Sequence, residues 1–280
     1  MRENAVQTGR DIVRLEGVCR NLRKKIVRMI GEAGSGHPGG SLSAVEIVAA
    51  LFFGGALRHR PAEPGWPDRD RFILSKGHAC PVLYAAYAEL GMIDEATLWT
   101  LRKLGSPLQG HPDVRRLPIL EASTGSLGQG LSFGLGEALA ARLDARPSRV
   151  YVLLGDGECN EGQVWEAAMS AAHHRADNLV AIVDANQQQL DGWTRDILGM
   201  EPVAEKWRAF GWHVIEVDGH DLAALLSAFD EARTIRGRPT CVLAHTVKGK
   251  GVSFMEFEIE FHGKAPTKDE VVRALAELDR

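Results

Sequence analysis

Cysteine is scarce in this sequence, and the spacing of the few cysteines excludes two common kinds of architecture. The chain has 280 residues and four cysteines, and none of them form a CxxC pair. A zinc knuckle or a disulfide framework needs closely spaced cysteines, so neither is expected. Isolated thiols are typical of a reducing compartment, and we therefore expect a cytoplasmic protein.

Long hydrophobic runs and an excess of either charge are also missing. No apolar stretch approaches the roughly 20 residues of a membrane span, and residues 1–29 are charged throughout, unlike a signal peptide. Lys and Arg number 33 against 37 for Asp and Glu, so nothing draws the whole chain to nucleic acid or to an anionic membrane. We expect a soluble protein with no nucleic-acid or membrane partner, and its length suits one large domain or two small ones.

What the sequence does contain is an alternation of helical and strand patterns. Apolar side chains recur every three or four residues in several segments, which predicts helices over 11–33, 41–53 (behind a serine cap), 131–146, 162–176 and 221–236. Short apolar runs predict buried strands at 71–75, 150–154, 179–185, 213–217 and 240–246. Strand followed by helix, repeated, predicts a doubly wound α/β fold with a mostly parallel sheet and helices on both faces. Ligands of such sheets bind at the carboxyl ends of the strands.

The segment LGDGECNEG, residues 154–162, lies at one such strand end and combines glycines with acids. Its three carboxylates, Asp156, Glu158 and Glu161, would repel the phosphates that glycine turns usually hold. A bound metal ion that offsets the carboxylates resolves this conflict. The segment has neither the third glycine of the dinucleotide fingerprint nor the GK[ST] of a P-loop, which excludes both nucleotide interpretations.

The spacing to the next strand makes the metal interpretation specific. A hard cation such as Mg²⁺ takes about six oxygen ligands, few of them from protein when a phosphate is present. Asp156 offers one oxygen, and Asn186, which follows the next predicted strand, offers a second at the same edge of the sheet. A backbone carbonyl of the run QQQ, residues 187–189, would be a third. Either side chain alone is explained more simply as a cap or turn residue, but the pair favours a metal.

One other motif suggests different chemistry. GLSFG, residues 130–134, matches the GxSxG nucleophile elbow of serine hydrolases. That elbow requires a strand directly before it, and STGSLGQ precedes it here. A serine hydrolase is therefore disfavoured.

The GDG turn with its later asparagine resembles the thiamine diphosphate and metal motif of a broad enzyme superfamily. Six segments, in order along nearly the whole chain, resemble the N-terminal half of transketolase: SGHPGG (35–40), DRFILSKGHA (70–79), LGSPLQGHPD (104–113), STGSLGQGL (123–131), GDGECNEGQVWEA (155–167) and FHGKAP (261–266). Six ordered motifs make the resemblance specific, and it implies a single thiamine diphosphate-binding domain over residues 1–280.

The resemblance implies a set of site residues. It assigns Mg²⁺, or Ca²⁺ or Mn²⁺ in its place, to Asp156, Asn186 and the carbonyl of Gln188. It assigns thiamine diphosphate to His78, Gly125, Ser126, Leu127, Asp156, Gly157, Glu161, Asn186, Lys248 and His262. Glu161 resembles a family glutamate at the subunit interface, and otherwise it is a solvated carboxylate. Catalytic roles beside the thiazolium fall to His37, His111 and His262.

The resemblance also implies an incomplete active site. Full-length transketolases continue with a second domain that carries the glutamate for cofactor activation. We therefore expect the N-terminal subunit of a split transketolase, paired with a separately encoded C-terminal subunit in a heterotetramer of two pairs. It would transfer a two-carbon ketol unit from a ketose or its phosphate to an aldose or its phosphate, in the pentose phosphate route or in a specialised sugar pathway. The alternatives are the α subunit of a 2-oxo acid dehydrogenase, a deoxyxylulose phosphate synthase and a non-catalytic cofactor-binding subunit.

Overall fold

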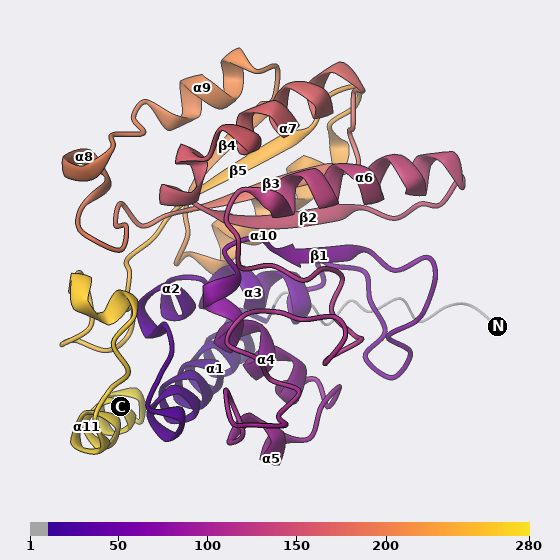
Figure 1. Ribbon diagram of the computed structural model, residues 1–280. Coiled ribbons are helices and arrows are strands. Elements are labelled where there is room, and N and C mark those ends of the chain that lie inside the picture. Colours follow the sequence, from indigo (N-terminus) through magenta and orange to yellow (C-terminus); the bar gives the residue numbers. More distant parts are fainter. Residues whose placement is uncertain (1–10) are drawn as a thin grey trace.

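A single parallel sheet organises the part of the chain that the computed structural model describes, residues 11–280 (Figure 1). Its strands lie in the order β1-β2-β3-β5-β4, and every neighbouring pair is parallel. They are β1 (Arg71–Leu74), β2 (Val150–Gly155), β3 (Leu179–Ala185), β4 (His213–Asp218) and β5 (Thr240–His245). All their carboxyl ends therefore reach the same edge, which we call the carboxyl edge; the opposite one is the amino edge.

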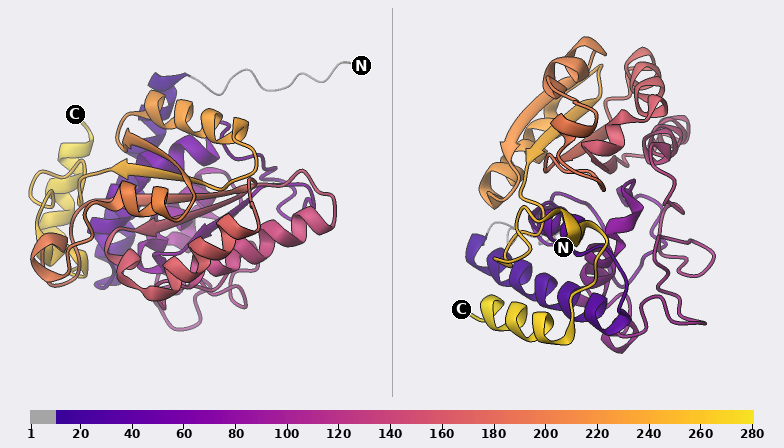
Figure 2. Two further views of the ribbon diagram at one scale, coloured as in Figure 1. Left: turned by 90° about the horizontal axis from the view of Figure 1, so that it is seen from above. Right: turned by 60° about the vertical axis from the view of Figure 1, so that its left-hand side comes forward.

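Helices cover both faces of the sheet, which confirms the predicted doubly wound α/β fold (Figures 1 and 2). One face carries α6 (Gln129–Leu143), α7 (Gly162–His173) and α9 (Val203–Ala209). The other carries α1 (Ile12–Ala33), α3 (Val45–Phe52), α4 (Cys80–Glu89) and α10 (Leu222–Thr234). The remaining helices are α2 (Pro38–Ser43), α5 (Glu95–Leu98), α8 (Thr194–Ile197) and α11 (Lys268–Leu278). Helix α11 lies beside α1. The short 3₁₀ turns are η1 (Gly77–Ala79), η2 (Gly157–Asn160) and η3 (Ile259–His262).

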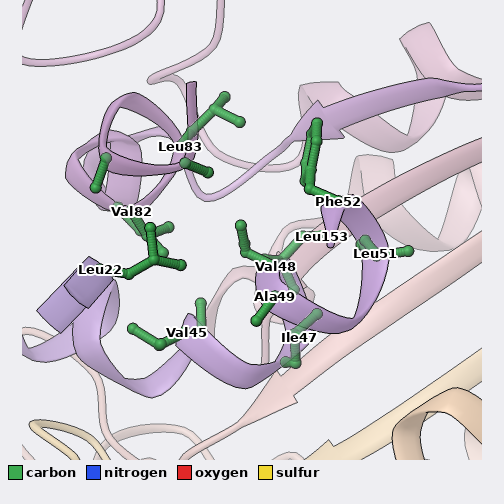
Figure 3. Packing of buried hydrophobic residues seen from close by; sticks show 14 of the residues in the cluster. Leu22, Val45, Ile47, Val48, Ala49, Leu51, Phe52, Val82, Leu83 and Leu153 are labelled. Atoms are coloured by element: carbon green, nitrogen blue, oxygen red, sulfur yellow. The ribbon is translucent and has the colours of Figure 1, made fainter. Parts of the chain in front are cut away.

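The central strands pack both of their faces into hydrophobic cores. Successive side chains of a strand point to opposite faces, so in β2 Tyr151 and Leu153 enter one core while Val150, Val152 and Leu154 enter the other. Figure 3 shows the first core, where the apolar side chains of α3 meet those of α1 and α4 beside strand β2. Burying a Leu or Val side chain contributes roughly 2 kcal/mol, so these two layers fix the strands that carry the site.

Two sequence expectations need correction. The helix expected over 41–53 behind a serine cap begins earlier, at Pro38, where the ring presets the first helical φ angle, and it divides into α2 and α3 at Ala44. Its N-cap residue is His37, whose side chain makes no capping bond. The strand expected to be buried at 213–217 is an edge strand, and most of β4 is only half buried because β5 is its single neighbour.

Two further observations concern the absences in the sequence. All four cysteines are buried free thiols, in agreement with the expected lack of disulfides. Within residues 11–280, no helix combines the length and the hydropathy required to cross a membrane.

Candidate functional site

The two predicted metal ligands meet at the carboxyl edge. Asp156 directly follows β2 and Asn186 directly follows β3, and the parallel register places Gly155 opposite Asp184. The backbone N–H of Gln187 donates to Asp156 Oδ2 over 2.6 Å. The structure therefore brings together residues that lie thirty positions apart in the sequence, as the βαβ spacing predicted.

Asp156 is a buried carboxylate with no cation paired to it among the described residues. It is 4% exposed, and the backbone N–H groups of Gly157 and Gln187 donate to its two oxygens. Burial, and next the nearby charge of Asp184, raise the pKa of Asp156 to about 7. A positive charge brought to this carboxylate would stabilise its ionised form.

The groups around Asp156 fit a hard cation that takes further ligands from elsewhere. Asn186 offers an amide oxygen, and the backbone carbonyl of Gln188 lies close enough to accept from Lys248 Nζ over 3.1 Å. Carboxylate, amide and carbonyl oxygens suit Mg²⁺, Ca²⁺ or Mn²⁺. Between residues 11 and 280, no group of three or more His, Cys, Asp or Glu side chains could hold a metal, so a cation here would need an outside ligand such as a phosphate.

The other two acids of the GDG segment do not share this position, and the expectation that one metal offsets all three is wrong. Glu158 is buried, and it accepts from Ser75 Oγ over 2.5 Å and from the N–H groups of Gly128 and Gly155 over 2.9 and 3.1 Å. These donors compensate its charge without a metal. Glu161 is exposed at the start of α7. Glu158 thus ties together the turns after β1 and β2 and the loop before α6.

A buried lysine lies beneath the site, and sequence reasoning missed it. Lys76, which follows β1, contacts Asp184 Oδ2 and donates to Gly40 O over 2.8 Å. Asp184 is fully buried and also accepts from the hydroxyls of Ser43 and Thr246. The lone acid inside the apolar run LVAIVDA is a sequence signal that some partner is present, since a buried charge requires one, but it does not identify Lys76 as that partner.

Four histidines lie close together beside the Lys76–Asp184 ion pair. The ring of His37 lies 5.2, 6.1 and 5.7 Å from those of His78, His111 and His262, and the rings of His78 and His262 are 5.1 Å apart. Lys248 Nζ donates to Nδ1 of His262 over 2.7 Å. The sequence motifs that carry these residues are distant in the chain, and the fold brings all of them to one place.

Burial and neighbouring cations hold these rings neutral. Burial first, and Arg102 next, lower the pKa of His37 to about 4; burial and then Lys248 lower that of His262 to about 3. Burial also lowers the pKa values of His78 and His111. Burial and then Lys76 lower the pKa of Lys248 to about 8. Lys76, Lys248 and Arg102 thus place positive charge beside the neutral rings, and a bound anion would offset it.

A cavity of about 480 Å³ opens between the carboxyl ends of the strands and these side chains. Predicted site residues that line it are His37, His78, Gly125, Leu127, Asp156, Gly157, Glu161, Asn186, Gln188, Lys248 and His262. Ser126 and His111 are not among its lining residues. Leu190, Ile197 and Leu198 add a partly exposed apolar rim that the sequence did not indicate.

The structure also shows whether the GxSxG motif forms a nucleophile elbow. Ser132 lies inside α6 rather than on a turn after a strand, and its hydroxyl accepts a hydrogen bond from Gln163 over 3.4 Å. The geometry of a nucleophile elbow is absent at this serine. The disfavoured hydrolase interpretation is therefore excluded for this motif.

Asp156 with amide and carbonyl oxygens beside it, next to Lys248 and four histidines at the carboxyl edge of a doubly wound sheet, is an arrangement suited to a metal-bound anionic ligand. Residues 16–278 match the family model described as "Transketolase, thiamine diphosphate binding domain". The chain belongs to the transketolase family, and it contains the thiamine diphosphate-binding domain of that family.

Two similar proteins are transketolase subunits of nearly the same length. The chain is 46% identical to the 6-deoxy-6-sulfo-D-fructose transketolase subunit SqwG of Clostridium sp., over 92% of this chain and 94% of the relative. It is 40% identical to an apulose-4-phosphate transketolase subunit of Phocaeicola vulgatus, over 91% of this chain and 90% of the relative.

Longer relatives match over part of their length. Human transketolase is 42% identical over 94% of this chain, which spans 42% of that protein. The structure of Pichia stipitis transketolase with sedoheptulose 7-phosphate superposes with a TM-score of 0.89 at 34% identity, over 95% of this chain and 40% of that one. The chain thus corresponds to about two fifths of these transketolases.

Proposed function

We propose that this chain is the diphosphate-binding, N-terminal subunit of a split transketolase. The observation that carries the proposal is Asp156, a buried carboxylate without a paired cation, set beside Asn186 and facing a cavity lined by histidines and Lys248. In a metal–diphosphate group, the metal would bring a positive charge to Asp156 and the diphosphate would bring a negative charge to Lys248 and the histidines.

Residues of this chain would hold the metal and the diphosphate. Asp156, Asn186 and the carbonyl of Gln188 would bind Mg²⁺, with Ca²⁺ or Mn²⁺ as substitutes of the same ligand preference. Because Lys248 now donates to that carbonyl, we expect its ammonium group to turn toward the diphosphate when the metal binds. His78 and His262 would add donors, and Gly157 lets the backbone approach.

Thiamine diphosphate, when bound, supplies a nucleophilic thiazolium carbon and an electron sink for the ketol unit. Gly125, Ser126 and Leu127 would hold its rings on the side opposite the metal. Gly125 has φ +149°, and a Cβ there would lie 3.1 Å from the ring of His111, so this approach requires glycine.

The histidine cluster would bind and orient the sugar. Neutral imidazoles can donate to one hydroxyl and accept from another, and the lowered pKa values keep His37 and His262 neutral at pH 7. His37, His111 and His262 would therefore fix the hydroxyl groups of the ketose and accept or return a proton. Such a polar cluster favours a sugar over a 2-oxo acid, which has fewer hydroxyl groups to bind.

A second subunit would complete the site. Two relatives named as transketolase subunits are covered over at least 90% of their length, which supports a split enzyme. The apolar rim, Leu190, Ile197 and Leu198, is 47–61% exposed, and a C-terminal subunit would cover it together with the open side of the cavity. Glu161, at the same rim, would face a subunit interface. Two such pairs would form a heterotetramer in the cytoplasm.

The substrates would be a ketose donor and an aldose acceptor bearing a phosphate or another anionic group. The names of the two subunit relatives specify a sulfonated fructose and apulose 4-phosphate, which widens the candidates beyond the pentose phosphate route.

Reconstitution tests the proposal. The chain is mixed with a C-terminal transketolase subunit, thiamine diphosphate and Mg²⁺, and is assayed with fructose 6-phosphate, 6-deoxy-6-sulfofructose or apulose 4-phosphate as the ketol donor and an aldose phosphate as the acceptor. We expect ketol transfer with the partner and none without it. Full activity of the lone chain would contradict the split site, and oxidative turnover of a 2-oxo acid would favour the dehydrogenase alternative.

A further inference from the structure

The segment that carries Lys248 is held by contacts that the proposed site does not use. Residues 247–251 follow β5 and form a glycine-rich turn. The N–H of Gly249 donates to Gly39 O over 3.1 Å, and the N–H of Phe257 donates to Lys248 O over 3.1 Å. Gly249 has φ +82°, and a Cβ there would lie 2.2 Å from Met255 O, so the turn tolerates little adjustment of its own.

A buried triad of charged and polar side chains lies behind this segment. Glu46 from α3 forms a two-pronged ion pair with Arg23 from α1, at 2.7 and 2.9 Å. His220, in the turn after β4, places Nδ1 2.9 Å from Glu46 Oε2. The side chains of Arg23 and Glu46 are each 9% exposed and that of His220 is 14% exposed.

Both partners of Glu46 reach the Lys248 segment. The backbone N–H of Val247 donates to Nε2 of His220 over 2.8 Å, and Arg23 Nε donates to Lys250 O over 2.8 Å. Since Nε2 accepts, Nδ1 carries the proton and donates to Glu46. One carboxylate therefore orients two groups that hold the backbone on either side of Lys248.

Stability alone does not explain such a triad. Removing three polar side chains from water is costly, and apolar side chains of similar volume often give equal or greater stability. Burial tends to raise the pKa of Glu46, but the hydrogen bond from His220 and the charge of Arg23 hold it below its ordinary value, so the carboxylate stays ionised. The triad instead fixes the position of residues 247–250 relative to α1, α3 and β4.

We propose that Glu46, through Arg23 and His220, positions the Lys248 segment and thereby sets the affinity of the chain for the metal-bound diphosphate. The inference rests on the proposed role of Lys248 toward that diphosphate. These are positioning residues, because they act through Lys248 and do not line the cavity. Their loss lets the segment move, which lowers the population of the competent arrangement and raises the apparent dissociation constant by the same factor.

His220→Ala tests the proposal, with His213→Ala as a matched control. His213 begins β4 at the amino edge and pairs with Glu231 over 2.7 Å, so both substitutions remove a histidine–glutamate pair that flanks one strand. Hydrogen exchange of the Val247 amide is measured in the ligand-free chain. The dissociation constant of thiamine diphosphate with Mg²⁺ and the kcat at saturating cofactor are measured with the partner subunit bound.

We expect His220→Ala to speed exchange at Val247 at least tenfold and to weaken cofactor binding about tenfold or more, with kcat at saturation within about twofold of the wild type. His213→Ala leaves Val247 exchange and cofactor affinity unchanged. Equal effects of the two substitutions, or an unchanged Val247 amide in His220→Ala, would overturn the proposal.

Glu46→Gln provides a second variant of the same shape in case His220→Ala does not fold. Its amide group presents a donor to either Arg23 or His220, so we expect the same loosening of residues 247–250. Unchanged exchange in this variant would also overturn the proposal. A wild-type complex that binds no thiamine diphosphate would refute the proposed function, whereas a binding-competent wild type with an unaffected His220→Ala would refute the positioning alone.

Discussion

Two buried aspartates, one at each edge of the sheet, differ in how their charge is compensated. Asp70 precedes β1 at the amino edge and Asp156 follows β2 at the carboxyl edge; they are 5% and 4% exposed. Each accepts from two backbone N–H groups, Asp70 from Arg58 and Arg149 over 2.9 Å. Asp70 also lies 3.5 Å from the guanidinium of Arg58, while the nearby charge that acts most on Asp156 is a second carboxylate, Asp184.

The cationic side chains around the two aspartates also differ in how their charge is compensated. At the amino edge, guanidinium groups end on backbone carbonyls: Arg149 donates to Asp177 O over 3.1 Å and Arg233 donates to Ala56 O over 2.5 Å. At the carboxyl edge, burial lowers the pKa values of Lys248 and His262, and the next cause is a lysine in each case: Lys76 for Lys248, and Lys248 for His262. The amino edge thus pairs Asp70 with a cation of its own chain, whereas at the carboxyl edge a bound cation would offset Asp156 and a bound anion would offset Lys248.

The substitution pair Asp156→Asn and Asp70→Asn should give the largest difference between the edges. We expect Asp156→Asn to weaken metal-dependent thiamine diphosphate binding at least about a hundredfold, because it removes the anionic ligand of the cation. Asp70→Asn should retain that affinity and lose about 1–3 kcal/mol of unfolding free energy, since the amide replaces an acceptor with a donor. Calorimetric titration and urea unfolding measure the two effects, and equal loss of binding in both variants would remove the distinction.

A second pair compares acids within the carboxyl edge itself. Glu158→Ala leaves the Ser75 hydroxyl and the N–H groups of Gly128 and Gly155 without an acceptor, so we expect a loss of roughly 2–4 kcal/mol of unfolding free energy. Glu161→Ala, on the exposed start of α7, should change it by less than about 0.5 kcal/mol. Urea denaturation of both variants decides the matter. A small effect at Glu158 would mean that the three loops do not depend on it.

The pH dependence of stability should follow the histidine cluster. The pKa values of these histidines are lower in the folded chain than in the unfolded chain. His37, for example, becomes protonated below about pH 6.5 in the unfolded chain but only below about pH 4 in the folded chain. The contribution of these histidines to the unfolding free energy of the ligand-free chain should therefore fall as the pH falls from 6.5 to 4, while the raised pKa values of Asp156 and Glu137 add a contribution of opposite sign in the same window. Thiamine diphosphate with Mg²⁺ should flatten this slope, since an anion favours the protonated rings. A slope unaffected by the cofactor would contradict the anion-binding role of the cluster.

Glu137 in α6 should give a smaller effect of opposite sign. Burial, and then the charge of Glu121, raise the pKa of Glu137 to about 7, and its Oε2 atom has no hydrogen-bond partner. A raised folded-state pKa adds stability that is fully present below about pH 4.5 and is lost as the pH rises through 7. We expect Glu137→Gln to remove about 2 kcal/mol of this dependence, as measured by urea unfolding between pH 5 and 8. An unchanged dependence of the unfolding free energy on pH would show that the pKa of Glu137 is not raised in the folded chain.

The sequence predicted the architecture well because hydrophobic periodicity reports which faces are buried. The strand beginning at Leu179 was placed at its observed ends, and the spacing from Asp156 to Asn186 placed both at one edge. Patterning could not reveal contacts between distant segments. The Lys76–Asp184 pair, the hydrogen bonds to Glu158 and the triad behind Lys248 depend on how helices dock onto the sheet, and neither spacing nor propensity encodes that docking.

The position of the metal decides which edge of the sheet binds the cofactor. It would be located in a crystal structure of the chain with its partner subunit, thiamine diphosphate and Mn²⁺, with anomalous scattering to identify the manganese. We expect manganese bonded to Asp156, Asn186 and the Gln188 carbonyl, with the diphosphate against Lys248 and the histidines. Manganese away from Asp156, or the diphosphate held by the arginines of the amino edge, would show that the carboxyl edge is not the cofactor site.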